Sequence, residues 1–439
     1  MKTVASRWSL VAGLFVFSLL GVAQEKPIAL KGGKLLTVTH GVIENGVLLI
    51  QDGKIAAIGT ASSTKIPKDA RVIDVTGMTV YPGLIDSETH LGLTEISAEE
   101  MTNDLIEPSE EITPQMHVYD AFHAESELIP VTRLNGITNA IVAPDSTDTL
   151  PGQDSFVQLD GKSATDMLLL RDIAMPLNFT GDQGRNKGGF AKWKFPATRM
   201  GLAAQLRQAF LDAQHYEQEW ADYEKKKSGI SSDKEKKGPP SPPKRDLKLE
   251  ALLPYLDGKR PIVLAAEEAS DLETAVNLAN EFHLKFVLNH ISHSQPVLDY
   301  VASLKVPVIV GPIYENPKPD ERYDVVYSLP AQLQKRGVQI AFASYDAHSS
   351  RNLPYQAGFA VAFGLPYDEA LKAITLNPAQ IWGVADKLGS LDVGKTANVV
   401  VANGDPLDLK TDVKQIFIEG REIPMTSRQT RLRDQYSGK

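Results

Sequence analysis

Three segments of the sequence end in side chains that could bind a metal ion or transfer a proton. The first ends in Asp86, Glu88 and His90, whose alternate spacing puts them on one face of a strand. Two later apolar runs end in His290 and Asp346. Carboxylate and imidazole groups together suit a borderline cation such as zinc. The alternative for the first segment is a buried polar cluster that ties a strand end to a neighbouring loop.

Other polar side chains follow the second and third of these runs. His293 comes three residues after His290, while Tyr345 and His348 flank Asp346. A single histidine in such a place is more often structural than functional. Because three separate strand ends carry metal-capable groups, we interpret His293, Tyr345 and His348 as candidate pocket residues.

The elements that must position these groups alternate between strand and helix. From residue 83 to residue 387, short apolar runs such as 262–266 and 339–343 are followed by segments with helical periodicity, such as 271–282. This pattern and length predict an α/β fold with a TIM-type (β/α)8 barrel, whose active sites lie at the carboxyl ends of the strands. A doubly wound open sheet is the alternative, but the sequence has no glycine-rich phosphate loop to support it.

Both ends of the mature chain are rich in strands. Two hairpins are predicted near the start, around Asp52-Gly53 and around Thr76-Gly77. β-branched runs recur at 397–402 and 413–418. Since neither end has enough strands for a core of its own, residues 24–82 and 388–439 are expected to form one composite β-sandwich.

The first residues are typical of a signal peptide. Lys2 and Arg7 precede an apolar run of twelve residues, and small residues up to Ala23 fit a cleavage site. We therefore expect residues 1–23 to be removed, with cleavage after Ala23, and the protein to be exported to the periplasm or secreted. An uncleaved membrane anchor is the alternative. The sequence has no cysteine, which excludes disulfides, thiolate metal ligands and lipidation of a thiol.

Charge and composition restrict the partners. A formal net charge of -9 argues against nucleic acid, and no other segment is long and apolar enough to predict a membrane span. Residues 225–245 are rich in lysine, serine and proline. They are expected to form a mobile surface insertion within the barrel, with a basic docking site as the alternative.

Three motifs give the sequence its resemblance to the amidohydrolase superfamily. Residues 82–86 (Pro-Gly-Leu-Ile-Asp) resemble the family's first barrel strand, and residues 375–379 and 388–398 resemble the last helix and the return into the sandwich. Residues 136–138 and 196–201 are similar to the exported imidazolonepropionase-like branch. The resemblance covers nearly all of the mature chain and implies a metal-dependent hydrolase.

The resemblance implies a metal site that departs from the family pattern. The family's first strand usually ends Asp-x-His-x-His, but Glu88 stands at the first histidine position and only His90 matches. His290 matches the sixth-strand histidine. Asp346 matches the eighth-strand aspartate, which binds metal and takes the proton from the attacking water. The metal ligands implied are therefore Glu88, His90, His290 and Asp346, with Asp346 also catalytic.

Two ligand positions of the family lack a metal-binding residue. The fifth-strand histidine falls at Ala265 and the bridging lysine of two-metal members falls near Leu177. We therefore expect at most one divalent ion per chain, with zinc favoured. The function implied is metal-assisted hydrolysis of carbon–nitrogen bonds in amides or small peptides. The alternative is an inactive barrel that binds a small ligand or serves as a partner subunit of an active relative. A homodimer is the default oligomer.

Overall fold

The computed structural model describes residues 26–179, 195–196, 198–228, 240–319 and 321–438. The predicted signal peptide lies outside the described residues, and so do residues 229–239 of the predicted insertion. The start of that insertion, residues 225–228, is the last turn of a helix. Within the described ranges, no helix combines the length and apolar character needed to cross a membrane.

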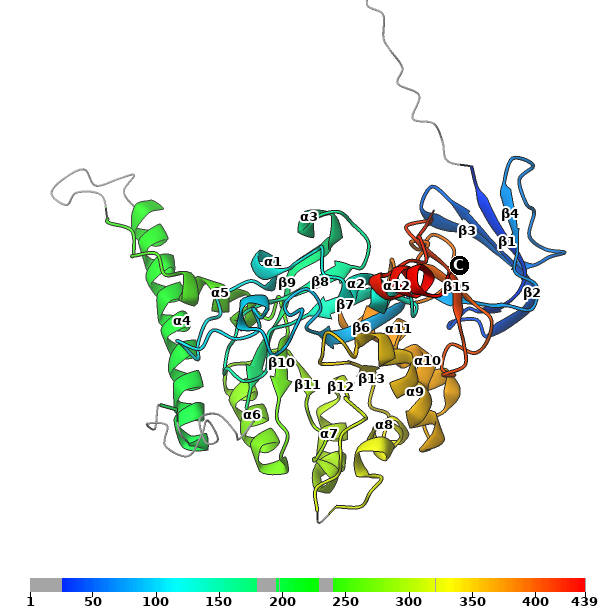
Figure 1. The fold of residues 1–439 in the computed structure, drawn as a ribbon. Coiled ribbons are helices and arrows are strands. Elements are labelled where there is room, and N and C mark those ends of the chain that lie inside the picture. The colour runs from blue at the N-terminus through cyan, green and yellow to red at the C-terminus, as the bar shows by residue number, and fades with distance from the viewer. Residues whose placement is uncertain (1–25, 180–194, 197, 229–239, 320, 439) are drawn as a thin grey trace, which may run out of the picture.

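Eight strands form the barrel sheet in the middle of the molecule (Figure 1). Their order around the sheet follows the chain, from β6 to β13. The strands are β6 (Leu84–Thr89), β7 (Ile137–Val142), β8 (Asp154–Gln158), β9 (Leu168–Asn178), β10 (Ile262–Ala265), β11 (Phe286–Asn289), β12 (Val308–Val310) and β13 (Ile340–Phe342).

The predicted (β/α)8 pattern is wrong at one strand, β8. β8 pairs antiparallel with both β7 and β9, whereas the other pairs in this sheet are parallel. An antiparallel strand can follow its neighbour through a short connection and needs no crossover helix. The chain therefore runs from β7 through β8 to β9 with a single four-residue helix, α3 (Ala164–Met167), between β8 and β9.

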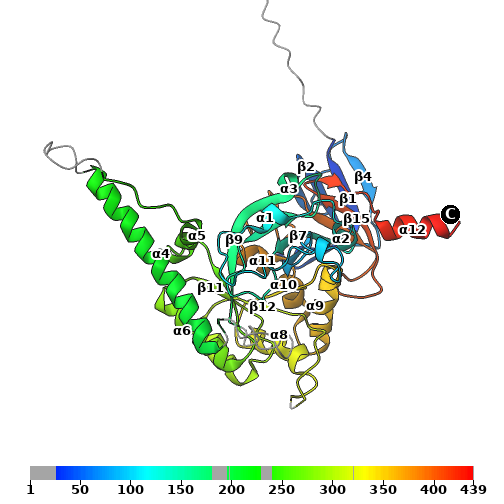
Figure 2. The same ribbon diagram turned by 60° about the vertical axis from the view of Figure 1, so that its left-hand side comes forward.

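Most of the helices follow barrel strands and lie on the outside of the barrel, whereas α12 (Arg428–Tyr436) follows the terminal sheet (Figure 1). The longest, α4 (Arg199–Ser228), lies on the side away from the terminal sheet in both views (Figures 1 and 2). The Asp246 side chain caps the start of α5 (Leu247–Leu256) by accepting from the backbone N–H groups of Lys248 and Leu249. The others are α1 (Val118–Ala121), α2 (Leu128–Arg133), α6 (Ala269–Glu281), α7 (Leu298–Leu304), α8 (Val325–Lys335), α9 (Leu353–Ala362), α10 (Tyr367–Ala373) and α11 (Leu376–Ile381).

Both ends of the chain contribute to a second sheet, as the sequence predicts, although the strands form one sheet where a β-sandwich was expected. Its strands belong to one hydrogen-bonded sheet, in which β14 pairs with β5 and so joins the two ends. They are β1 (Ile28–Leu36), β2 (Val42–Gln51), β3 (Lys54–Thr60), β4 (Arg71–Asp74), β5 (Thr79–Pro82), β14 (Val399–Ala402), β15 (Val413–Ile418) and β16 (Arg421–Glu422).

The two predicted hairpins have different outcomes. β2 and β3 form an antiparallel hairpin, with Asp52 and Gly53 both at positive φ in the turn. The hairpin predicted around Thr76-Gly77 is wrong, because β4 and β5 each pair parallel with β1, at successive positions along it. Residues 75–78 therefore connect two strands that continue in the same direction.

The base of the barrel is filled by apolar side chains. One interior cluster takes a residue from each of the seven strands β6 to β12 and one from the segment after β13. α11 and the segment after it add four more side chains to this cluster. The twelve buried members are Ile85, Ile141, Phe156, Ala174, Val263, Val287, Ile309, Ala343, Ala379, Trp382, Val384 and Leu388. On β7 to β12 this cluster identifies which residues face the interior, whereas β6 has an irregular register between Asp86 and Thr89.

Candidate functional site

The interior positions at the carboxyl ends of the strands form a polar layer above this base. Val263 and Val287 face inward, so the next residues on the same face are Ala265 and Asn289, which stand opposite one another on β10 and β11. Asn178 stands opposite Ala265 on β9. This edge is where barrels of this type build their sites.

A hydrogen-bonded chain crosses the mouth of the barrel. The Asn289 amide donates to Oε2 of Glu88 at 2.5 Å, and the Tyr345 hydroxyl donates to Oδ1 of Asn289. Glu88 and Asn289 are both buried. The chain connects β6, β11 and the segment after β13, and it fixes one oxygen of the Glu88 carboxylate.

The other oxygen of Glu88 faces an imidazole. Nε2 of His290 lies 3.8 Å from Oε1 of Glu88 and, among the described residues, is buried without a hydrogen-bond partner. The His290 ring packs against the Tyr345 ring, with 4.3 Å between centroids. Both residues have positive φ, 50° and 54°. Left-handed non-glycine residues cost conformational energy and gather at functional sites.

Polar contacts close the seam between β6 and β13. The backbone N–H groups of Ser344 and Tyr345 donate to the Glu88 carbonyl at 3.1 and 3.0 Å. The Ser344 N–H also lies 3.0 Å from Oδ1 of Asp86. Further along, the Thr89 hydroxyl contacts Ser350 at 2.5 Å. These contacts join the two strands that complete the barrel.

Two carboxyl groups near the mouth are fully buried. Burial raises the pKa of Asp86 to about 7, although hydrogen bonds from Ser344 act in the opposite direction. Asp154 stands opposite the inward-facing Ala174 and so faces the interior. Burial, and then the charge of Glu88, raise the pKa of Asp154 well above its usual range.

The structure does not bring the four predicted metal ligands together. Nδ1 of His90 lies 2.9 Å from the Ala143 carbonyl, and Oδ1 of Asp346 accepts from the Ser349 N–H at 2.6 Å. Among the four, His290 and Glu88 form an imidazole–carboxylate pair, 3.8 Å apart. No group of three or more His, Cys, Asp or Glu side chains within the described ranges is placed to hold a metal ion. These residues therefore do not fit a zinc site, which needs at least three protein ligands.

The predicted pocket residues also separate. Tyr345 belongs to the mouth, as described above. His293 pairs with Glu321 at 2.8 Å and with Glu267 at 3.4 Å, in the loops that follow the strands. His348 is exposed. Of the three, Tyr345 alone contacts the residues around Glu88.

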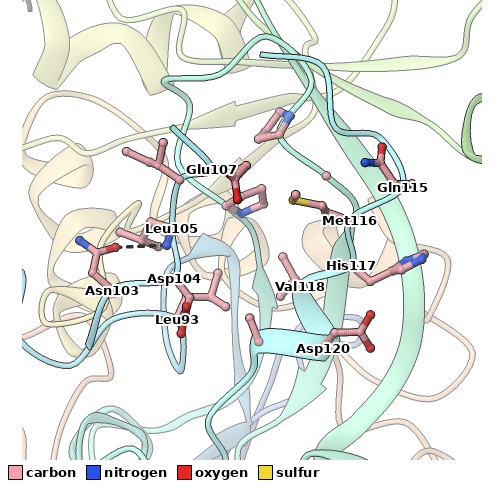
Figure 3. A pocket seen from close by; sticks show the side chains of 15 residues that line it. Leu93, Asn103, Asp104, Leu105, Glu107, Gln115, Met116, His117, Val118 and Asp120 are labelled. Atoms are coloured by element: carbon pink, nitrogen blue, oxygen red, sulfur yellow. Dashed lines mark hydrogen bonds between the residues drawn. The ribbon is translucent and has the colours of Figure 1, made fainter. Parts of the chain in front are cut away.

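A recess of about 440 Å³ lies among the segments that follow β6 and β7 (Figure 3). Residues 103–107, which follow β6, form one wall, and residues 115–121 form the other. The lining is apolar at Leu93, Leu105 and Met116, with carboxylates at Asp104 and Glu107. Because its segments follow β6 and β7 and precede the antiparallel β8, the recess opens on the same end of the barrel as the mouth.

Sequence reasoning missed three residues of the mouth: Asn178, Asn289 and Asp154. Asn289 lies two positions after Val287 and so shares its face, but only the structure shows that Val287 faces inward. Asp154 could have been found only by recognising β8 as antiparallel, which puts the start of that strand at the mouth. Asn178 ends β9, next to Leu177, near which the sequence analysis put the absent bridging lysine; Leu177 itself packs in the outer core.

Comparisons with known proteins agree with this architecture. The model of the amidohydrolase family matches residues 267–423. The amidohydrolase tasK of Hapsidospora irregularis is 24% identical over 400 residues, which cover 86% of this chain and 39% of that protein. The chain thus spans about two fifths of that relative. A dihydroorotase of Syntrophus aciditrophicus is 42% identical over 64 residues, 15% of each chain.

A solved structure covers a larger share of the chain. The amidohydrolase from Thermotoga maritima is 26% identical, with a TM-score of 0.76, and the match covers 91% of this chain and all of that one. The barrel, the terminal sheet, the family match over residues 267–423 and this solved structure thus agree in their similarity to the amidohydrolase superfamily.

Proposed function

We propose that the chain hydrolyses carbon–nitrogen bonds of small amide-type compounds at the mouth of the barrel. The observation that carries this proposal is the pair formed by Oε1 of Glu88 and Nε2 of His290, 3.8 Å apart at the carboxyl ends of the strands. Relatives in the same superfamily support the class of bond, since they include proteins named dihydroorotase, enamidase and D-hydantoinase. Cyclic amides, acyl-amino acids and small peptides are the candidate substrates.

The pair can activate a water molecule as a reactant. A water between Glu88 and His290 would be within hydrogen-bond reach of both groups. Glu88 accepts a proton as the water oxygen bonds to the carbonyl carbon, and His290 orients the water. The proton then passes to the leaving nitrogen as the carbon–nitrogen bond breaks. Such general base catalysis contributes about 10²- to 10⁴-fold to rate.

The recess among the segments that follow β6 and β7 supports a substrate of mixed character. Its apolar wall can bury an alkyl or aryl group, while Asp104 and Glu107 favour a positively charged or N–H-rich group. Amides with one apolar substituent and one free amine are therefore the first compounds to test.

The proposal uses no metal-bound step, because the described residues do not supply three ligands. Zinc is typical of the superfamily, and the expectation of at most one ion per chain remains a prediction. A measured requirement for added zinc would favour the ligands implied by the resemblance, His90 and Asp346 included.

Replacing Glu88 by Gln tests the proposal. The amide keeps the size of the side chain and can still accept from Asn289, but it cannot take a proton. We expect turnover of a cyclic-amide, acyl-amino-acid and dipeptide panel to fall at least about 100-fold, with the fold unchanged by circular dichroism. The matched control is Glu273→Gln on the outer face of α6, where the side chain is exposed. Equal activity of E88Q and the wild type would contradict the proposed role.

A non-catalytic barrel is the second candidate. It is favoured by the way the mouth uses its polar groups: Oε2 of Glu88 and both ends of the Asn289 amide are already hydrogen bonded. In this case the mouth binds a ligand, or the chain pairs with an active relative. Binding of panel compounds without turnover, or co-purification with a related chain, would support it.

We also propose export with cleavage after Ala23, from the charge and apolar pattern of residues 1–23. The chain is similar to an imidazolonepropionase over 54 residues. This similarity supports the imidazolonepropionase-like branch, so substrates of that class should be included in the tests. A homodimer is the proposed oligomer. N-terminal sequencing of the cell-exported protein and light scattering would check cleavage and oligomeric state.

A further inference from the structure

Polar side chains are buried at the mouth of the barrel, whereas the base is apolar. Glu88, Asp154, Asn178 and Asn289 are all buried there, and buried polar groups cost free energy unless they are paired. β6 and β13 do not share a strand ladder in the barrel sheet, whose order begins at one of them and ends at the other. Some other contact must hold the two strand ends together.

Glu88 supplies part of that contact, beside the bonds made by Asp86 and Thr89. The carbonyl of Glu88 accepts from Ser344 and Tyr345, and its carboxylate accepts from Asn289. The Tyr345 hydroxyl in turn donates to Oδ1 of Asn289. Every link joins different strands or the segments that directly follow them. A metal ion bound by residues of several strand ends would join the same parts of the barrel.

We infer that the chain Tyr345–Asn289–Glu88 takes the structural place of a metal ion, so that this barrel closes its mouth and positions the Glu88 carboxylate without a cation. The inference concerns metal binding and closure, and it stands whether or not the proposed hydrolysis is confirmed.

The register of β10 and β11 makes the inference testable by gain of function. Ala265 and Asn289 face inward side by side, and the Asn289 side chain already reaches Glu88. Imidazoles at these two positions would join the Glu88 carboxylate, giving two nitrogens and one oxygen at one point. That is a zinc ligand set with a free fourth position. In the wild type, a methyl group and an amide occupy these positions.

The experiment compares the wild type with Ala265→His/Asn289→His by zinc titration calorimetry and thermal unfolding. The double variant is expected to bind one zinc ion on the order of 100-fold more tightly than the wild type and to gain thermal stability when zinc is added. The matched control adds Glu88→Gln to the double variant, which removes the third ligand and should lose most of the gain. A folded double variant that binds zinc no better than the wild type would overturn the inference.

Two measurements on near-native protein decide the matter if the double variant does not fold. Wild-type protein dialysed against a chelator should unfold at the same temperature as before dialysis. Tyr345→Phe, which removes only the hydroxyl, should unfold about 2 °C lower, and added zinc should not restore it. A clear fall in the unfolding temperature of the wild type on chelation would overturn the inference, as would rescue of Tyr345→Phe by zinc.

Discussion

The base and the mouth of the barrel are filled by opposite kinds of side chain. The base holds a closed set of apolar residues from every strand or its immediate extension. At the mouth, carboxyls and amides are equally buried, and one oxygen of Asp154 and Nε2 of His290 have no partner among the described residues. The base can only stabilise the fold, whereas the mouth holds groups whose burial is costly unless a ligand or a reaction uses them.

The largest expected effect lies at the base. Phe156 is fully buried in the interior cluster, so Phe156→Ala removes a large apolar side chain and leaves a cavity. We expect the free energy of unfolding to fall by about 3–5 kcal/mol. Urea unfolding followed by circular dichroism measures it. A loss below about 1 kcal/mol would mean that the base relaxes around the cavity and is not closely packed.

A smaller loss is expected when the polar chain is cut at the mouth. Asn289→Ala removes the amide that joins Tyr345 to Glu88 and leaves both partners buried without it. The free energy of unfolding should fall by about 1–3 kcal/mol. The same urea titration applies. An unchanged or higher stability would show that the chain does not tie the strand ends together.

The smallest effect has the opposite sign and depends on pH. Because burial raises the pKa of Asp154, the folded state keeps a proton that the unfolded state releases above about pH 4. Stability therefore falls as pH rises from that value toward the raised folded-state pKa. Asp154→Asn removes this penalty and should gain on the order of 1 kcal/mol at pH 7.5, with little difference from the wild type below pH 4. A loss at pH 7.5 would mean that the ionised Asp154 makes a stabilising contact.

The difference between base and mouth also explains what could be predicted from the sequence. Apolar periodicity determines which segments are strands and helices, so the barrel and the composite terminal sheet were predictable. Which residues of each strand face the interior was not predictable. Val287 faces inward, which points Asn289 into the mouth and leaves His290 in a left-handed conformation just beyond the strand. The sequence favoured His290 as the interior ligand in place of Asn289, one residue earlier. Sequence spacing alone does not assign faces to a four-residue strand.

Strand direction was the second unpredictable feature. Residues 154–158 are a short buried strand, and its residues do not show which way the strand runs. Only pairing with β7 and β9 puts Asp154 at the mouth. The pairing of β4 and β5 with β1 depends in the same way on contacts distant in sequence. Local turn signals at Thr76-Gly77 could not reveal it.

The closure of the mouth without a cation is tested most directly by the metal content of the native protein. Full-length protein should be purified without chelators or metal-affinity steps and analysed for zinc, manganese and iron per chain. Well below one equivalent of any ion is expected, because the described mouth offers the imidazole–carboxylate pair of His290 and Glu88 but no group of three metal-binding side chains. One full equivalent that survives dialysis would contradict it and would restore His90 and Asp346 as ligands.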